Sequence, residues 1–384
     1  MSIRPFMLAL AVTAPALVVA QDAPLRSVHH PYRVVTVAEG VSNPWSMAFL
    51  PGGDMLVTER AGRLRVIRSG RLLAEPVTGL PAIRVGNQGG LLDVVAHPDF
   101  ARNRLVYISY AKPNAAGDQS TTAVIRARFE NNALTNVQEI FEANAWSRGQ
   151  GHYGSRLAFD GKGYLFITVG DRQVPPQGDL EKHPAQDLSV HNGKVIRLHE
   201  DGRVPADNPF VGREGALPQI WSYGHRNPQG LLIDAAGNVW ATEHGPQGGD
   251  ELNLVQPGKN YGWPVIGFGV NYRSGSNIHS GTTREGMEQP VKVWVPSIAT
   301  SGLMQYSGRA FPGWQGHVFA GGLVGEVLWR LKIENGRVTE EEQLLTRRGR
   351  IRDVRQGPDG FIYVAIEDRM GAPTSILRLE PAGR

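Results

Sequence analysis

The stretch that decides the fold is His152-Tyr-Gly-Ser-Arg-Leu-Ala-Phe-Asp-Gly-Lys-Gly-Tyr-Leu-Phe-Ile-Thr-Val-Gly-Asp171. Residues 156–159 and 164–169 are rich in apolar, β-branched and aromatic side chains, and a Gly-rich turn at 160–163 separates them. This pattern predicts a β-hairpin. With the turn centred between positions 161 and 162, residues whose numbers sum to 323 lie opposite each other, as His152 and Asp171 do. We therefore expect an imidazole beside a carboxylate, the arrangement that orients a general base.

Similar units recur along the whole chain. A Gly or Asn turn followed by an apolar strand occurs six times, near Gly53, Asn103, Gly163, Gly237, Gly316 and Gly360. Most copies follow a short apolar strand, and five precede a strand with an apolar-Arg pattern. Such a repeat without helices predicts an all-β fold, a six-bladed β-propeller of four-stranded antiparallel blades. We expect the strand at 32–38 to close the ring by joining the last blade; a pair of β-sandwiches is the alternative.

Composition limits the classes of protein that remain. The chain has 384 residues and a net charge of +4, with acidic and basic residues interspersed, so nucleic acid is not an expected partner. No Pro/Ser-rich linker divides it, which favours a single propeller domain over residues 21–384. The absence of cysteine excludes disulfides, a lipoprotein anchor, iron–sulfur ligation and thioether-bound haem.

The first twenty residues differ from the rest. Arg4 precedes an apolar run from Phe6 to Val19, and small or short residues lead up to Ala20. This pattern predicts a secretory signal peptide over residues 1–20, because the run is short for a membrane span. The mature protein would then be periplasmic or secreted, without a membrane span.

Polar residues stand where the innermost strand of each predicted blade begins, and these strand starts meet at one mouth of a propeller channel. They are Trp45, Gln88, His152, Arg226 with Asn227, Ser301, and Arg350 with Arg352. Guanidinium groups crowded in one cleft repel each other unless an anion joins them, and their geometry suits carboxylate or phosphate. The alternative is that each arginine pairs with a local acid, such as Arg350 with Glu367 or Arg352 with Asp353.

A second polar cluster follows the fourth predicted blade hairpin. Hairpin pairing places Arg226 opposite Gly245, which Pro246 follows. The stretches 243–253 and 258–263 are rich in glycine, carboxylates and free carbonyls, the ligands that calcium prefers, although acidic Gly-rich loops are often only turns. The chain lacks the G-x-G-x-x-G, G-x-x-x-x-G-K-[ST] and H-E-x-x-H motifs, so nicotinamide, nucleoside triphosphate and zincin chemistry lack their expected sequences.

Taken together, these motifs resemble the soluble quinoprotein glucose dehydrogenase and aldose sugar dehydrogenase family, also called the glucose/sorbosone dehydrogenases. The resemblance spans most of the mature chain and lies in Asn87-Gln88-Gly-Gly-Leu-Leu, His97-Pro-Asp-Phe100, His152 with Gly170-Asp171, Tyr223-Gly-His-Arg-Asn-Pro-Gln-Gly230, Glu243-His-Gly-Pro246 and Arg350-Ile-Arg-Asp353. It implies a six-bladed propeller that uses calcium and pyrroloquinoline quinone (PQQ), a tricarboxylate. That cofactor is an anion of the kind that the arginines require.

The resemblance also implies roles for individual residues. His152 would take the proton of the sugar C1 hydroxyl, Asp171 would orient His152, and hydride would pass to PQQ. The product would be a lactone, and the electrons would go on to an external quinone or cytochrome. PQQ would be held by Gln88, Arg226, Asn227, Arg350 and Arg352, with Arg226 polarising the quinone oxygen.

Two metal sites are implied as well. The carbonyls of Gly245 and Pro246 would hold the calcium ion that bridges to PQQ, and Glu251 and Tyr261 would bind a separate structural calcium. Family members commonly carry a cofactor-contacting lysine after the Gly-Leu of the fifth blade, where this chain has Val324. A calcium-dependent propeller hydrolase such as a lactonase, and a non-catalytic binding propeller, are the alternative functions.

Overall fold

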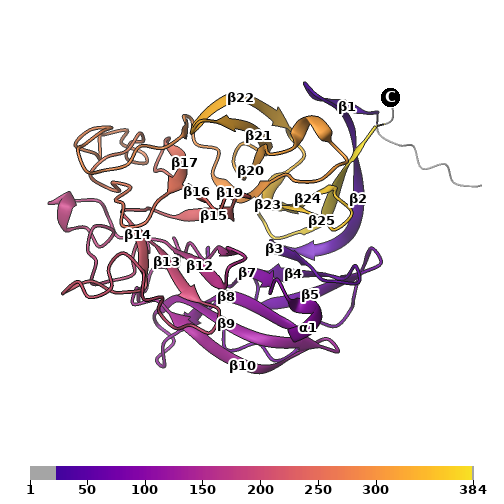
Figure 1. The fold of residues 1–384 in the computed structure, drawn as a ribbon, viewed down its shortest axis with the longest axis horizontal. Coiled ribbons are helices and arrows are strands. Elements are labelled where there is room, and N and C mark those ends of the chain that lie inside the picture. The colour runs from indigo at the N-terminus through magenta and orange to yellow at the C-terminus, as the bar shows by residue number, and fades with distance from the viewer. Residues whose placement is uncertain (1–22, 383–384) are drawn as a thin grey trace, which may run out of the picture.

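Six antiparallel β-sheets surround a common axis in the computed structural model of the protein, which describes residues 23–382 (Figure 1). The predicted six-bladed β-propeller is therefore confirmed. Five sheets have four strands, and the sixth has five. Helix in the described residues is limited to three short segments, α1 (Phe100–Asn103), η1 (Leu180–Lys182) and η2 (Pro312–Trp314). None of them is long and apolar enough to cross a membrane. The predicted signal peptide, residues 1–20, lies outside the described residues.

The blades follow one another along the chain. Blade 1 contains β3 (Pro44–Phe49), β4 (Met55–Glu59), β5 (Arg63–Arg68) and β6 (Arg71–Leu72). Blade 2 contains β7 (Leu91–Ala96), β8 (Leu105–Pro113), β9 (Ser120–Glu130) and β10 (Ala133–Glu142). Blade 3 contains β11 (Leu157–Phe159), β12 (Tyr164–Val169), β13 (Lys194–His199) and β14 (Ile220–Tyr223).

The second half of the ring has the same order. Blade 4 contains β15 (Pro228–Ile233), β16 (Val239–Glu243), β17 (Asp250–Val255) and β18 (Lys292–Trp294). Blade 5 contains β19 (Thr300–Gln305), β20 (Val318–Gly322), β21 (Val327–Glu334) and β22 (Arg337–Leu344). Blade 6 contains β23 (Arg350–Gln356), β24 (Ile362–Glu367) and β25 (Pro373–Pro381), together with β2 (Pro31–Ser42) and β1 (Leu25–Arg26).

The ring is closed by a strand from the N-terminal end of the described chain. β2 pairs antiparallel with β25, with Val34 opposite Leu379, as predicted for the strand that begins near Tyr32. β1 extends this sheet by a two-residue pairing with β2, which accounts for the fifth strand. The closure joins the two ends of the repeat array, so no blade is left with an exposed inner face.

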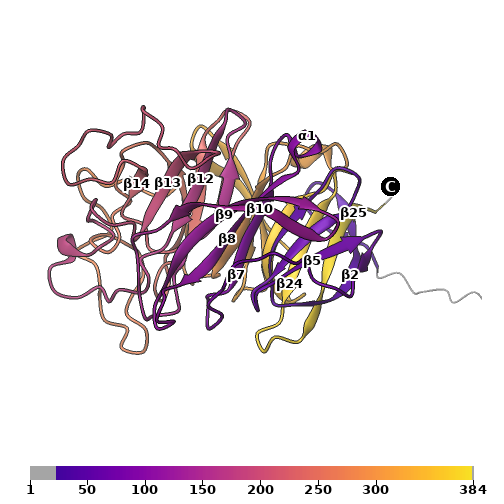
Figure 2. The same cartoon turned by 90° about the horizontal axis from the view of Figure 1, so that it is seen from below.

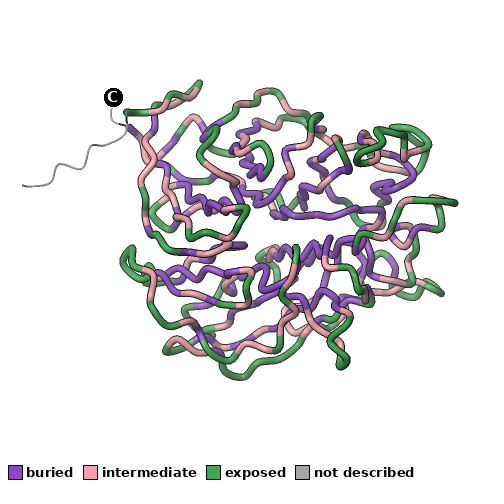
Figure 3. The backbone as a smooth tube through the Cα atoms, turned by 180° about the vertical axis from the view of Figure 1, so that it is seen from behind, coloured by how far each residue is buried: buried purple, intermediate pink, exposed green. Residues whose placement is uncertain are grey.

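Apolar side chains fill the space between neighbouring blades. Every residue of β4 is buried, because its two faces pack against different blades. Leu56 and Val66 of blade 1, for example, share a core with Val94 and Ile108 of blade 2. Figure 3 shows the buried backbone toward the centre and the exposed backbone at the periphery. The long connections of blades 3 and 4 extend beyond the strands on the side where β14 lies (Figure 2).

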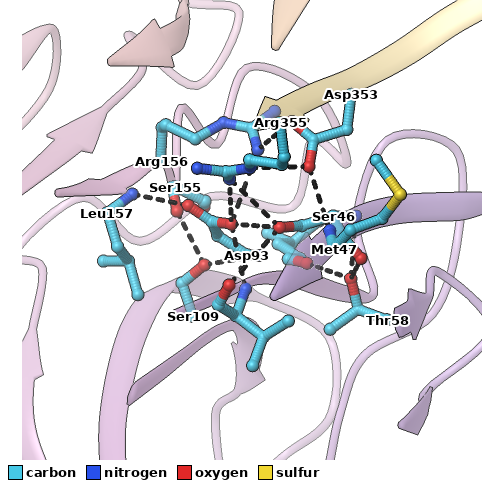
Figure 4. Close-up of polar contacts among 12 residues, drawn as sticks. Ser46, Met47, Thr58, Asp93, Ser109, Ser155, Arg156, Leu157, Asp353 and Arg355 are labelled. Atoms are coloured by element: carbon cyan, nitrogen blue, oxygen red, sulfur yellow. Dashed lines mark hydrogen bonds and ion pairs between the residues drawn. The ribbon is translucent and has the colours of Figure 1, made fainter. Parts of the chain in front are cut away.

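A buried network of charged side chains crosses the central channel (Figure 4). Asp93 of blade 2 and Asp353 of blade 6 accept from Arg156 (3.4 and 3.0 Å) and from Arg355 (3.1 and 2.9 Å). Arg156 comes from the segment that leads into blade 3, and its Nε donates to the carbonyl oxygen of Gln229 in blade 4 (2.8 Å). Two guanidinium groups thus balance two carboxylates, and the network connects four blades on the axis.

Replacing Arg156 with Met should lower the free energy of unfolding by about 3–5 kcal/mol, because Asp93 and Asp353 would stay buried with one counter-charge fewer. Urea denaturation at neutral pH measures this change. Arg128→Met is the matched control, since Arg128 pairs with Glu130 at side-chain exposures of 39% and 45%. Its loss should be at most about 1 kcal/mol. Equal losses in the two variants would contradict the role assigned to Arg156.

Candidate active site

The predicted register of the central hairpin is wrong by one residue. Phe159 pairs with Leu165, so the numbers of paired residues sum to 324 rather than 323. The Asp160 carboxylate is the physical reason, because it accepts hydrogen bonds from two backbone N–H groups of the turn, including that of Tyr164 (3.0 Å). These hydrogen bonds close the turn at Tyr164, so the turn is one residue longer than predicted. His152 and Asp171 are therefore not a directly opposed strand pair.

The contact between His152 and Asp171 forms by another route. His152, Gly154 and Ser155 have φ values of 46°, 64° and 78°, so the backbone leaves strand geometry just before β11. The turn made by these left-handed residues brings the imidazole to the carboxylate. Gly170 allows the close approach, because a Cβ at that position would lie 2.2 Å from the His152 carbonyl oxygen. The predicted pair is present, although the predicted reason for it is wrong.

The imidazole of His152 is oriented by a chain of hydrogen bonds. Its Nδ1–H donates to Asp171 Oδ1 (2.6 Å), and Asp171 Oδ2 accepts from Trp263 Nε1 (2.8 Å). His152 Nε2 has no partner within residues 23–382. The side chain lines a cavity of about 190 Å³, together with Val174, Pro175, Pro176, Trp263, Tyr272 and Ile278. Nε2 is thus the ring nitrogen that remains free to accept a proton.

Burial lowers the pKa of the His152 imidazole, and the nearby Arg226 guanidinium lowers it further, while the Asp171 carboxylate acts in the opposite direction. Burial acts to raise the pKa of Asp171, but the His152 ring and its hydrogen bond outweigh burial, so the pKa is lower than usual. The stable arrangement at neutral pH is therefore an ionised Asp171 beside a neutral imidazole whose proton is on Nδ1.

Arg226 lies in the same cavity as His152. Its Nη1 donates to the carbonyl oxygens of His244 (3.2 Å) and Gly245 (2.7 Å), which confirms the predicted proximity of Arg226 and Gly245. Its Nε is buried and has no partner among the described residues. The Arg226 carbonyl accepts from the backbone N–H of Asp171 (2.8 Å), so blades 3 and 4 position the two charged groups together.

A larger cavity of about 360 Å³ is lined by Gln88, Arg350 and Arg352, three of the predicted cofactor-binding residues. We call this space the mouth cavity, and the space of about 190 Å³ lined by His152 and Arg226 the His152 cavity. The two adjoin, because the Gln88 side-chain oxygen accepts from the backbone N–H of His152 (2.8 Å). Arg352 donates to Glu367 through Nε (2.7 Å) and also pairs with it through Nη2 (2.6 Å). The alternative pairing of Arg352 with Asp353 is wrong, because Asp353 belongs to the channel network.

Arg350 lies opposite Glu367 in the strand register, as the alternative pairing proposed, but the contact is loose. Its Nε is 4.0 Å from the Glu367 carboxylate and makes no hydrogen bond within the described residues. Its Nη1 donates to the Leu323 carbonyl oxygen (3.3 Å). Val324, in contrast, is 68% exposed and does not line the cavity. Val324 therefore forms no part of the cavity wall.

Asn227 and Ser301 are buried near the mouth cavity without lining it. The Asn227 Oδ1 accepts from the backbone N–H of Gly154 (3.1 Å), and its Nδ2 has no partner in the described chain. The Ser301 hydroxyl donates to the carbonyl oxygen of Ile351 and so connects blade 5 with blade 6. The expectation that Ser301 faces the mouth is wrong, because its hydroxyl serves this contact between the blades.

The predicted metal-binding residues Gly245, Pro246, Glu251 and Tyr261 line one cavity, together with Glu243. Burial raises the pKa of Glu251 to about 8, and the Glu243 carboxylate acts in the same direction. The Tyr261 hydroxyl donates to the Leu254 carbonyl oxygen, which leaves only its backbone carbonyl for an ion. Within residues 23–382 no three His, Asp or Glu side chains form a metal-holding group, so a cation here would depend on backbone carbonyls.

Trp263, Arg60 and Arg369 belong to the site but were not predicted, and Glu367 was named only as a possible partner of Arg350. Glu367 ends β24, and Arg60 directly follows β4. Because paired strands are antiparallel, the end of each second strand meets the start of the innermost strand at the same mouth. Charged residues at the ends of the second strands were the available signal. Trp263 stands at the end of the Gly-rich stretch 258–263, where no pattern indicates the Asp171 contact.

Comparison with known proteins places this geometry in a family. The profile of the Glucose / Sorbosone dehydrogenase family matches residues 41–378. The chain is 42% identical to aldose sugar dehydrogenase YliI of Escherichia coli over 91% of its length and 92% of that protein. It is 25% identical to quinoprotein glucose dehydrogenase B of Acinetobacter calcoaceticus, over 87% and 85% of the two chains. The PQQ-bound aldose sugar dehydrogenase from Streptomyces coelicolor superimposes with a TM-score of 0.74 at 28% identity, covering 93% of this chain and 99% of the other.

The lowered pKa of His152 predicts a pH-dependent contribution to stability. In the unfolded chain the His152 imidazole takes up a proton near pH 6.5, whereas burial in the folded protein disfavours that proton. His152 therefore lowers the free energy of unfolding as the pH falls below about 6.5, and it has little effect above that pH. We expect the drop in melting temperature between pH 7 and pH 5 to be smaller in His152→Gln than in the wild type. Thermal scans at several pH values measure this difference. A larger drop in the variant would contradict a lowered pKa.

Proposed function

Because the chain belongs to the glucose/sorbosone dehydrogenase family, we propose that it is a PQQ-dependent aldose sugar dehydrogenase. It would oxidise the C1 hydroxyl of an aldose to the lactone. The observation that carries the proposal is the imidazole of His152, whose free Nε2 lies in one cavity with Arg226, beside a mouth lined by guanidinium groups. The preferred aldose is left open by this argument.

The mouth cavity fits an anionic cofactor. Arg350 Nε in this cavity, Arg226 Nε in the adjoining His152 cavity and Asn227 Nδ2 nearby are buried donors without partners in the described residues, which is costly unless a ligand accepts from them. Gln88, Arg226, Asn227, Arg350 and Arg352 would hold PQQ, with the arginines facing its carboxylates. Bound PQQ would supply the two-electron acceptor for the hydride that leaves C1.

The residues of the chain would handle the proton. The sugar hydroxyl would donate to His152 Nε2, which takes the proton as the carbon–oxygen double bond forms. Asp171 holds the Nδ1–H tautomer and stabilises the imidazolium, while Trp263 holds Asp171 in place. Arg226 would place positive charge on the cofactor side of the cavity. The apolar wall, which includes Pro175 and Ile278, would limit the access of water to the reacting groups.

Calcium ions fit the loop that follows β16. The Gly245 carbonyl oxygen accepts from the Arg226 guanidinium and keeps a second lone pair for a cation. We propose that calcium binds beside Arg226, held by the carbonyls of Gly245 and Pro246. A second calcium ion would lie at Glu251 and the Tyr261 carbonyl, where it would offset the burial of two neighbouring carboxylates.

The electrons taken up by the cofactor would pass to an external quinone or cytochrome in the periplasm or outside the cell.

His152→Gln should reduce turnover at least about a hundredfold, because it removes the general base. Asp171→Asn should cause a similar or smaller loss, through the wrong tautomer or a loosened ring. The assay is steady-state oxidation of an aldose by the protein reconstituted with PQQ and calcium, with an artificial electron acceptor.

His199→Gln is the control for His152→Gln, since His199 ends β13 and lines neither of the two site cavities. It should keep wild-type turnover. A PQQ titration accompanies each variant, and His152→Gln should bind the quinone as tightly as the wild type does. Near wild-type turnover in His152→Gln would refute the mechanism. Wild-type protein that neither binds PQQ nor oxidises any aldose would refute the function and leave a hydrolase or a binding propeller.

Removal of calcium should abolish activity and lower the melting temperature, because an ion bound only by the folded protein stabilises it by mass action. Exhaustive chelation followed by a thermal scan tests this, and added calcium should restore both properties. Glu251→Gln should reduce the calcium-dependent gain in melting temperature. If chelation changes neither property, the assignments of Gly245, Pro246, Glu251 and Tyr261 are wrong.

A further inference from the structure

The mouth cavity contains two arginines to which the proposed function gives no role. Arg60 follows β4 of blade 1, and Arg369 lies in the connection between β24 and β25 of blade 6. Both line the cavity of about 360 Å³ with Arg350 and Arg352. Four guanidinium groups, from blades 1 and 6, therefore surround one space.

The positive charge of this cavity exceeds its negative charge. Glu367 is the only carboxylate among its lining residues. Four guanidinium groups against one carboxylate leave an excess of three positive charges. Guanidinium groups confined in one cavity repel each other unless anions compensate them. PQQ, a tricarboxylate, is an anion that can compensate this excess.

The carboxylate of Glu367 does not satisfy the four arginines. Arg352 Nη2 lies 2.6 Å from the Glu367 carboxylate, whereas Arg60 Nη1 lies 3.4 Å and Arg350 Nε 4.0 Å from it. Arg369 makes no ion pair within the described residues, is exposed, and lines the cavity. Burial lowers the pKa of Arg60, Glu367 opposes this effect, and the neighbouring Arg352 and Arg350 add to it. Arg60 and Arg369 therefore have guanidinium N–H groups available to a ligand.

The backbone holds Arg60 at the mouth. Its N–H donates to the Asn43 carbonyl oxygen (3.0 Å), and its carbonyl oxygen accepts from the Leu91 N–H (3.3 Å) at the start of the innermost strand of blade 2. A Cβ at Gly90 would lie 1.8 Å from the Arg60 carbonyl oxygen, so only glycine allows this contact. The same short segment carries Gln88. The Gln-Gly-Gly sequence thus places Arg60 beside a proposed cofactor-binding residue.

We propose that Arg60 and Arg369 are further cofactor-binding residues, which contact the carboxylates of PQQ and complete the positive wall of the mouth cavity. This inference rests on the proposed function, because it takes PQQ as the ligand. Among the lining residues of the cavity, the fifth blade contributes no cation, and Val324 is not one of them. Arg60 of blade 1 and Arg369 of the β24–β25 connection supply the positive charge instead.

Titration of the calcium-loaded protein with PQQ, followed by the absorbance of the quinone, tests the proposal directly. Arg60→Gln and Arg369→Gln should each weaken PQQ binding about tenfold or more, since each removes a charge-assisted contact. Arg60→Lys should recover part of the affinity because it keeps the charge. The dissociation constant of Arg60→Gln should also rise less steeply with salt than that of the wild type. Thermal scans verify that each variant is folded.

Two reference variants separate the outcomes. Arg71→Gln removes an exposed arginine of blade 1 that does not line the cavity, and it should bind PQQ as the wild type does. Arg350→Ala tests the proposed function itself. If the wild type binds PQQ and Arg350→Ala weakens binding, while Arg60→Gln and Arg369→Gln match Arg71→Gln, this inference is overturned and the proposed function stands. If wild-type protein does not bind PQQ, both fail.

Discussion

The pairing of β2 with β25 is the constraint on which the rest of the structure depends. It joins a strand that begins at residue 31 to one that ends at residue 381, so the six blades form a closed ring. The candidate site takes residues from blades 1, 2, 3, 4 and 6, and none of these blades could hold its part of the site alone. His152, which precedes blade 3, and Arg226, which precedes blade 4, line one cavity because the ring fixes the distance between these blades.

Charge organises the centre of the ring in two different ways. On the axis, Arg156 and Arg355 balance Asp93 and Asp353, and the four side chains form a neutral, hydrogen-bonded network. At the mouth, four guanidinium groups share only Glu367. A balanced buried network is a structural element, whereas an unbalanced cavity is ready for an anionic ligand. The protein thus keeps its channel connected by charge pairs and leaves its mouth positive.

The orientation of His152, the proposed general base, depends on backbone geometry that is unusual for histidine. The left-handed conformation at His152, next to Gly154 and Ser155, directs the ring to Asp171 and frees Nε2 toward the cavity. Gly170 has no side chain to prevent this approach. Trp263, from the connection between β17 and β18 of blade 4, then fixes the carboxylate. Three separate segments of the chain therefore determine the position of one imidazole.

The sequence by itself determined the blade count, the closing strand and most residues of the site, because a strand repeat and its turn residues are local signals. It also indicated that Gln88, His152, Arg226, Arg350 and Arg352 converge, since the innermost strands begin at a common mouth. The register near His152 was open in the sequence, because local hydrogen bonds to the Asp160 carboxylate enlarge the turn by one residue. Tertiary structure alone decided that Ser301 faces Ile351 and that Trp263 and Arg60 reach the site. These contacts join segments far apart in the chain, and a local pattern carries no information about them.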